Sequence, residues 1–196
     1  VHRHEKSGAL HGLMRVRCFT QDDAHLYMTD EHVKDEIIGV YRLAEKIYAA
    51  FGFKYKVELS TMPEDHIGTV AMWEKATKGL KDALDEMKVP YMINEGDGAF
   101  YGPKIDFHLR DSLNRTWQCG TIQVDFSMPG RLGAEYVDED NSRKTPVMLH
   151  RAVLGSLERF IGILVENHSG ALPLWLAPVQ MVVMNISQAQ EEYAGK

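Results

Sequence analysis

The sequence predicts an α+β fold, in which helices and strands follow one another along a single chain. Some segments place apolar residues three or four positions apart, which is the spacing of one face of an α-helix. Others alternate apolar and polar residues, as a strand with one buried face does. The helical segments are 33–50, 70–87 and 151–165, and the alternating segments are 53–60, 105–110 and 117–126.

Composition restricts the class of protein. A chain of 196 residues can bury one sizeable core or two small ones. Its net charge of −6 excludes a basic field over the whole molecule, so any RNA contact must come from local patches. Two cysteines, Cys18 and Cys119, are too few for a disulfide framework or a cysteine-rich zinc module. This cysteine usage fits a reducing compartment, so we expect a cytoplasmic protein. No apolar run is long enough to span a membrane, and we expect no membrane contact.

The start of the chain predicts a β-hairpin. Arg3 and Glu5 alternate before a glycine-containing loop, and a second run carries Arg15 and Arg17 on one face and ends at Phe19. Guanidinium groups suit phosphate and carboxylate oxygens, and an aromatic ring suits a flat base. A nucleotide-binding hairpin and a simply exposed basic hairpin both fit this pattern.

The two helices that follow are predicted to be structural. Thr29 is a candidate N-cap for the first, which ends near Gly52. The second ends before Pro90, because proline disfavours helical geometry in the residue before it. Its inward face is predicted to be Met72, Ala76, Leu80, Leu84 and Met87.

A constrained loop follows at 96–104. Three glycines and a proline allow backbone to approach a ligand closely, and Tyr101 and Lys104 offer a hydroxyl and an ammonium group there. A ligand-binding loop and a structural turn both fit this composition.

The strand at 117–126 has a polar face formed by Thr121, Gln123 and Asp125. Strict alternation places Gln118 on the opposite, apolar face. A half-buried antiparallel strand and the floor of a binding site both fit such a polar face.

Residues 146–150 predict a short strand that ends in His150, and the helix 151–165 follows directly. That helix has a stripe of small residues around one arginine, namely Ala152, Gly155, Arg159 and Gly162. A ligand beside the guanidinium fits the stripe, and so does close packing of the helix on a sheet. A lone histidine at the position of His150 is usually a structural residue.

The end of the chain predicts a linker from Pro173, a strand over 179–186 and a helix capped by Ser187. We therefore expect two domains, 1–176 and 177–196. The chain begins without a methionine, directly in the hairpin, and stops soon after a helix starts. These ends predict a fragment of a larger protein.

Three stretches resemble one family. Residues 2–25, HRHEKSGALHGLMRVRCFTQDDAH, resemble motif 2 of class II aminoacyl-tRNA synthetases in its threonyl-tRNA synthetase form. Residues 98–107, GAFYGPKIDF, are close to a signature of the same family, and residues 150–160, HRAVLGSLERF, resemble class II motif 3. The resemblance covers essentially the whole chain. One departure is Cys18, where the family usually has glycine.

The resemblance implies part of the class II catalytic fold, an antiparallel β-sheet flanked by helices. It implies a threonine–tRNA ligase, which uses ATP to convert threonine to threonyl-adenylate and transfers it to the 3′ end of tRNA(Thr). The implied partners are ATP with Mg²⁺, L-threonine and tRNA(Thr), with a homodimer in the intact enzyme. Residues 177–196 would begin its C-terminal anticodon-binding domain.

The resemblance also assigns site residues. Those carried over as catalytic are Arg3, Lys104 and Arg159. Those carried over as ATP-binding are Arg3, Glu5, Arg15, Phe19, Gln118 and Arg159. Those carried over as threonine-binding are Gln21, Asp23, Tyr101, Gln123 and Ser156. Placing Gln118 beside Gln123 requires a bulge near Gly120.

The family holds a zinc ion with two histidines and a cysteine, and the zinc binds the amine and hydroxyl of threonine. The matching histidines are His25 and His150, while the cysteine lies upstream of this chain, and neither Cys18 nor Cys119 replaces it. Asp23 should point the same way as His25 and accept the hydroxyl hydrogen bond. We therefore expect this chain alone to bind zinc weakly or not at all.

Two alternative functions are a non-catalytic binding module and a related enzyme for another amino acid. A non-catalytic, synthetase-like binding module would be favoured by loss of Arg3 or Arg159, and both are present. A sister class II enzyme for serine or proline is disfavoured by the FTQDDAH segment and by the pair of histidines.

Overall fold

A six-stranded sheet forms the centre of the computed structural model, which describes residues 1–195. The strand order is β1-β8-β5-β4-β2-β3, and every neighbouring pair is antiparallel except β2 and β3. The strands are β1 (Ala24–Met28), β2 (Tyr55–Ser60), β3 (Met92–Asn94), β4 (Lys104–Arg110), β5 (Thr116–Asp125) and β8 (Val147–Ala152). The predicted α+β fold with a mainly antiparallel sheet is confirmed.

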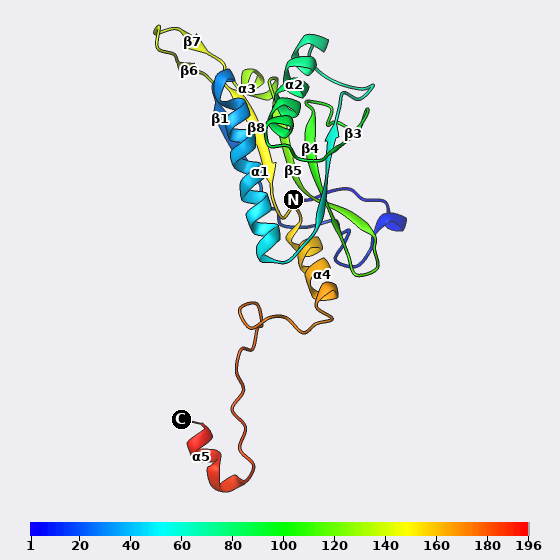
Figure 1. Ribbon diagram of the computed structural model, residues 1–196, viewed down its shortest axis with the longest axis vertical. Helices are drawn as coiled ribbons and strands as arrows, with labels where there is room; N and C mark the ends of the chain where they lie inside the picture. Colours follow the sequence, from blue (N-terminus) through cyan, green and yellow to red (C-terminus); the bar gives the residue numbers. More distant parts are fainter. Residues whose placement is uncertain (196) are drawn as a thin grey trace.

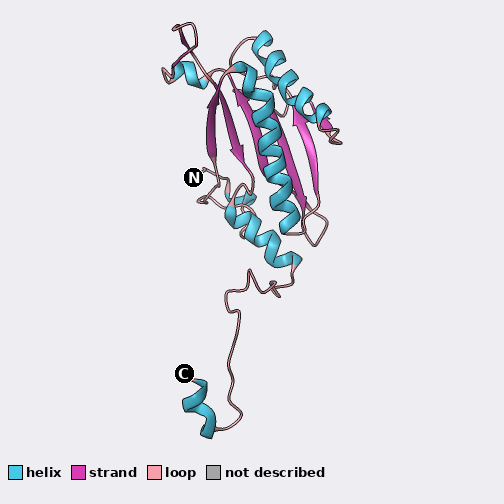
Figure 2. Cartoon of the chain, turned by 60° about the vertical axis from the view of Figure 1, so that its left-hand side comes forward, coloured by secondary structure: helices cyan, strands magenta, loops and turns pink. Residues whose placement is uncertain are grey.

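Two long helices, α1 (Val33–Ala50) and α2 (Val70–Glu86), pack side by side on one face of the sheet. Figure 2 shows α1 lying lengthwise over the strands. Their apolar faces meet those of the central strands in a core whose fully buried side chains include Ile37, Tyr48, Leu80, Leu84, Phe107, Ile122 and Leu149. Burial of such faces is the main favourable term in folding.

Both helices lie where the apolar spacing predicts them, with small differences. Thr29 makes no cap bond to backbone, and its hydroxyl contacts the ring of His32 at 2.8 Å. Met72 is only partly buried, and Trp73 takes the inward position instead. Gly52 ends α1 with a φ of +72°.

The remaining elements are short. They are η1 (Ser7–Ala9), η2 (Asp30–His32), α3 (Met128–Arg131), β6 (Tyr136–Val137), β7 (Arg143–Lys144), η3 (Gln188–Gln190) and α5 (Glu191–Ala194). Strands β6 and β7 form an exposed hairpin, whose turn and second strand carry the charged run at 138–144.

The N-terminal segment does fold back on itself, but the predicted pair of continuous strands is wrong. Isolated bridges, His2 with Cys18 and His11 with Arg15, replace two continuous strands. The 3₁₀ turn η1 and a positive φ at Gly12 interrupt the pairing, so side chains do not alternate strictly between two faces.

The predicted start of the third long helix is also wrong. That helix, α4, spans Leu157–Asn167, because β8 continues through Ala152 and a turn at Gly155 has a φ of +70°. Ser156 is its N-cap and accepts a hydrogen bond from the backbone of Arg159. Ala152 and Gly155 therefore lie outside the helix, and only Arg159 and Gly162 share it.

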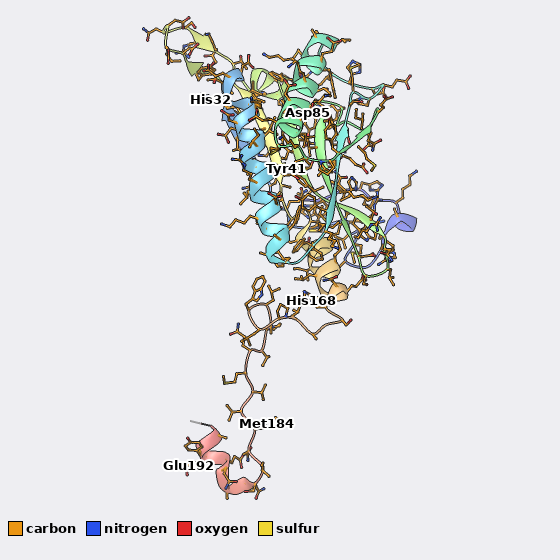
Figure 3. The ribbon with its side chains drawn as sticks, in the orientation of Figure 1. His32, Tyr41, Asp85, His168, Met184 and Glu192 are labelled. Atoms are coloured by element: carbon orange, nitrogen blue, oxygen red, sulfur yellow. The ribbon has the colours of Figure 1, made fainter. Side chains whose placement is uncertain are left out.

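The end of the chain extends away from the sheet and helices, as Figures 1 and 3 show at Met184. The predicted strand over 179–186 is wrong, since no strand is assigned there and these residues are exposed. A strand requires a neighbour for its backbone N–H and C=O groups, and residues 1–195 provide none for this segment. Ser187 precedes η3, not a long helix. No helix within residues 1–195 combines the length and apolar character needed to cross a membrane.

Candidate active site

A cavity of about 390 Å³ opens on the face of the sheet opposite α1 and α2, under the N-terminal segment. Every residue predicted to bind ATP or threonine lines it, together with Lys104 and His150. His25 is the one predicted residue that does not. The other lining residues are Met14, Val16, Cys119, Thr121, Arg151 and Ala152.

The N-terminal segment supplies one wall of the cavity. Arg15 forms an ion pair with Glu5 at 3.0 Å, and the backbone N–H of Arg3 donates to the carbonyl of Arg17 at 2.9 Å. The Arg3 guanidinium lies over the ring of Phe19, 5.1 Å from its centroid, which is a cation–π geometry. An irregular backbone is thus held by charged and aromatic side chains.

Arg159 joins this wall to the sheet. Its Nε donates to the carbonyl of Met14 at 2.7 Å, and its Nη1 donates to the carbonyl of Gln118 at 2.6 Å. Burial, together with the positive charges of Arg15 and Arg3, lowers the pKa of the guanidinium. Four arginines line this cavity, namely Arg3, Arg15, Arg151 and Arg159, and such a concentration of positive charge suits an anion.

A β-bulge brings Gln118 to the floor of the cavity. Phe107 pairs with Gly120, and the next residue of β4, His108, pairs with Gln118, so Cys119 is the extra residue. The bulge places Gln118 on the same face as Gln123. The predicted bulge near Gly120 is confirmed.

Only glycine fits at position 120. A Cβ there would lie 2.4 Å from the hydroxyl of Tyr48 and 2.8 Å from the carbonyl of Val153. That hydroxyl, on α1, donates to the same carbonyl. The bulge is therefore fixed from behind by the core helix.

Asp106 lies beneath the floor and does not itself line the cavity, and the sequence patterns assigned it no role. Its buried carboxylate accepts hydrogen bonds from Ser60 at 3.1 Å, Thr121 at 3.0 Å and Gln118 at 2.5 Å, and pairs with the ammonium of Lys104 at 2.8 Å. The signal was present, because alternation along β4 puts Asp106 on the same face as Lys104.

Lys104 reaches the cavity between two carboxylates, Asp106 and Asp97. Burial is the largest single influence on its pKa and lowers it. The two carboxylates outweigh burial, so the pKa is raised above its ordinary value. Lys104 is therefore a permanent cation at neutral pH.

The loop before β4 lies close to backbone, as its glycines predict. A Cβ at Gly102 would lie 2.0 Å from the carbonyl of Val124. Held there, Tyr101 donates from its hydroxyl to Gln123 at 2.7 Å, and its ring centroid lies 5.1 Å from that of His150. Burial, followed by the charges of Asp125 and Asp23, raises the pKa of the Tyr101 hydroxyl.

The two histidines face each other across adjacent strands. His25 on β1 pairs with His150 on β8, and their ring centroids are 4.7 Å apart. Nε2 of His150 lies 3.0 Å from the buried carboxylate of Asp125, a residue of the predicted polar face whose contact with the histidine was not foreseen. Metal-binding histidines usually have such a carboxylate partner. Residues 1–195 hold no cluster of three or more metal-ligating side chains, so the pair offers two ligands.

Neighbouring aspartates in the polar cluster have different contacts. Asp23 lines the cavity. The carboxylate of Asp22 instead accepts the backbone N–H groups of Val153, Leu154 and Gly155 at 2.9–3.2 Å, and so fixes the turn before α4. This contact could not be read from the sequence, since more than a hundred residues separate the partners.

Comparison with known proteins identifies the family of this fold. Residues 1–168 match the family model of the tRNA synthetase class II core domain (G, H, P, S and T). The chain belongs to the class II tRNA synthetase core family. The class II assignment drawn from the motifs at 2–25 and 150–160 is thereby confirmed.

The sequence relatives compared with this chain are threonine–tRNA ligases. The chain is 63% identical over 196 residues to the threonine–tRNA ligases of Clostridium botulinum and Clostridium tetani, of which it spans 31% of the length. It is also similar to a crystal structure of the RNA-binding domain of threonyl-tRNA synthetase from Cryptosporidium parvum, with a TM-score of 0.95 and 47% identity. That match covers 100% of this chain and 49% of the other.

Proposed function

We propose that this chain forms the amino-acid-activating site of a threonine–tRNA ligase. The observation that carries the proposal is the cavity itself, which gathers Arg3, Arg15, Arg159 and Lys104 above a polar floor in a class II core. Relatives named threonine–tRNA ligase match the chain over its whole length, which supports threonine as the amino acid.

The proposed reaction joins the threonine carboxylate to the α-phosphorus of ATP and releases pyrophosphate. Positioning and neutralisation of charge dominate such a step. Arg3 bridges the carboxylate and the α-phosphate, and Lys104 lies near the phosphates as a fixed cation. Arg15 and Arg159 hold the distal phosphates or the other face of the adenine. Mg²⁺ accompanies the nucleotide.

The adenine end is assigned to Glu5, Phe19 and Gln118. Phe19 offers a ring to the base, and its position in the cavity wall beside Arg3 supports this role. Glu5 is oriented by its ion pair with Arg15.

The threonine end is assigned to Gln21, Asp23, Tyr101, Gln123 and Ser156. The Tyr101 hydroxyl, oriented by its bond to Gln123, is positioned to contact the amine. Asp23 accepts a hydrogen bond from the threonine hydroxyl. A site that reads a hydroxyl with polar groups rejects an isosteric apolar analogue such as valine by about four orders of magnitude.

His25 and His150 are proposed to hold zinc in the intact protein. Their facing rings and the Asp125 partner of His150 fit that role, and a third ligand from outside this chain completes the set that a substrate-binding zinc requires. When bound, the ion supplies a Lewis acid for the amine and hydroxyl of threonine. Metal analysis tests the assignment, because full-length protein with both histidines changed to alanine should lose its zinc. Retention of stoichiometric zinc would contradict it.

The wider setting is proposed from the family resemblance. It comprises tRNA(Thr) as the acceptor, a homodimer, a cytoplasmic location, and an anticodon-binding domain that begins in 177–196. Light scattering on the full-length protein should give twice the mass of one chain.

Pyrophosphate exchange in the full-length protein tests the function. Exchange should depend on threonine and be weak with serine and much weaker with valine. Exchange that prefers serine or proline would replace the proposed substrate, and ATP binding without exchange for any amino acid would favour a non-catalytic module.

A further inference from the structure

Arg159 is held by more than its two bonds to backbone. The Cζ of its guanidinium also lies over the indole ring of Trp117, 5.5 Å from the ring centroid. Trp117 does not line the cavity, and it immediately precedes the floor residue Gln118. The indole therefore contacts Arg159 from outside the cavity lining.

The indole is itself fixed by a buried carboxylate. Its Nε1 donates to Asp111 at 2.8 Å, and the Asp111 side chain is completely buried. The same carboxylate accepts the backbone N–H groups of Leu113 and Arg115 and the Nε of Arg115. Burial acts to raise the pKa of Asp111, but the bonds from Trp117 and Arg115 outweigh it and lower the pKa, so the anion persists. Asp111 therefore ties the Trp117 indole to the backbone of the β4–β5 turn and fixes its position.

The ring also receives the loop that precedes Met14. His11 stacks on Trp117 with ring centroids 5.9 Å apart and planes 26° from parallel, and Nη1 of Arg115 lies 3.2 Å from Nε2 of His11. Arg115 reaches α4 as well, through Glu166 at 3.3 Å. Figure 1 shows the three segments meeting at this end of the sheet, with the N-terminal segment in dark blue beside the β4–β5 turn.

We propose that Trp117 is the positioning residue for Arg159. Its one indole orients this guanidinium and also fixes the position of the N-terminal wall through His11. The proposal rests on the proposed function, since it concerns how Arg159 receives ATP. Arg159 donates its two hydrogen bonds to the carbonyls of Met14 and Gln118. Gln118 directly follows Trp117 in the chain, and Met14 lies three residues after His11. Removing the indole leaves the Arg159 guanidinium with its two carbonyl bonds alone. It also frees the loop from His11 to Met14, which loses its ring contact.

The effect should fall on ATP and not on threonine. Trp117→Leu should raise KM for ATP about ten-fold in pyrophosphate exchange, as expected from loss of a cation–π contact in a desolvated setting, with KM for threonine within about two-fold. Trp117→Phe retains a ring face but loses the bond to Asp111, so it should restore KM for ATP to within about three-fold of wild type. Its melting temperature should fall with that of Trp117→Leu, which separates stability from positioning.

Trp175→Leu is the matched control. This indole is more than half exposed and packs on Phe51, away from the cavity, so its loss should leave both Michaelis constants unchanged. A double-mutant cycle then tests the route of action, because a residue that works through Arg159 has nothing further to lose once Arg159 is absent. Trp117→Leu added to Arg159→Ala should raise KM for ATP no more than about two-fold beyond Arg159→Ala alone.

These measurements use the full-length protein and separate this proposal from the proposed function. Threonine-dependent exchange by the wild type tests the function alone. Given that exchange, additive effects in the cycle, or equal changes in KM for ATP and threonine in Trp117→Leu, would overturn the role of Trp117. A fall in kcat alone, with both Michaelis constants unchanged, would overturn it too and leave Trp117 as a purely structural residue.

Discussion

The floor and the wall of the cavity are built in different ways. The floor, formed by Lys104, Gln118, Thr121 and Gln123 above the buried Asp106, lies on continuously paired strands whose other face is the hydrophobic core. The wall, formed by Arg3, Glu5, Arg15 and Phe19, belongs to a segment with isolated bridges and no continuous strand. Arg159 donates one hydrogen bond toward each. Substitutions at the floor should therefore change both ligand binding and the stability of the fold. Substitutions in the wall should change ligand binding more than stability.

The strongest test of this difference is in the floor. Asp106→Asn removes the charge that pairs with the nearly buried Lys104 ammonium, and breaking a buried pair costs about 3 kcal/mol or more. Both the free energy of unfolding and adenylate formation should therefore fall, as measured by thermal melting and pyrophosphate exchange. Asp97→Asn is the matched control, because this second carboxylate near Lys104 is exposed and should matter little. Equal effects of the two changes would contradict the role of Asp106.

At the junction, Arg159→Ala should weaken ATP use far more than it lowers stability. Loss of a charge-assisted contact from a water-poor site costs about 2–4 kcal/mol of transition-state stabilisation. Near-normal exchange with a lowered melting temperature would make Arg159 structural and remove the link between floor and wall.

Within the wall, Phe19→Ala should raise KM for ATP more than KM for threonine. Base stacking on an aromatic ring is worth about 1–3 kcal/mol. The comparison of the two Michaelis constants is the measurement, and equal changes in both would show that Phe19 supports the wall without contacting the base.

The smallest expected effect comes from the charges of the wall. Arg15→Ala should raise KM for ATP several-fold yet change stability by less than about 1 kcal/mol, since its ion pair with Glu5 is half-exposed. Arg17→Ala is the control, because Arg17 donates to the backbone carbonyl of Glu5 and does not line the cavity. If Arg17→Ala weakened ATP use as much as Arg15→Ala, the effect would arise from the segment as a whole.

The same contrast explains how far the sequence could predict the structure. Periodic burial specified α1, α2, β4 and β5, and the demand that Gln118 join Gln123 predicted the bulge that Gly120 makes possible. Periodicity failed where geometry depends on distant partners. The turn before α4 depends on Asp22, and small residues continued the helical spacing through it.

Some site residues also escaped prediction for a physical reason. Asp106 and Asp125 act through partners on neighbouring strands, and Trp117 acts through Asp111 and Arg159, so their roles depend on pairings that a single sequence does not display. Motif resemblance selected cavity-lining residues well because motifs record side chains that meet in space. It gave no information on what holds those side chains in place.

Equilibrium binding of a non-hydrolysable threonyl-adenylate analogue tests the central claim most directly, because the analogue spans both the wall and the floor. Calorimetry on the full-length protein should show tight binding that both Phe19→Ala and Asp106→Asn weaken, with the larger fall in melting temperature in Asp106→Asn. The seryl and valyl analogues should bind more weakly than the threonyl one. No binding of the threonyl analogue, or binding that neither change affects, would contradict the assignment of this cavity.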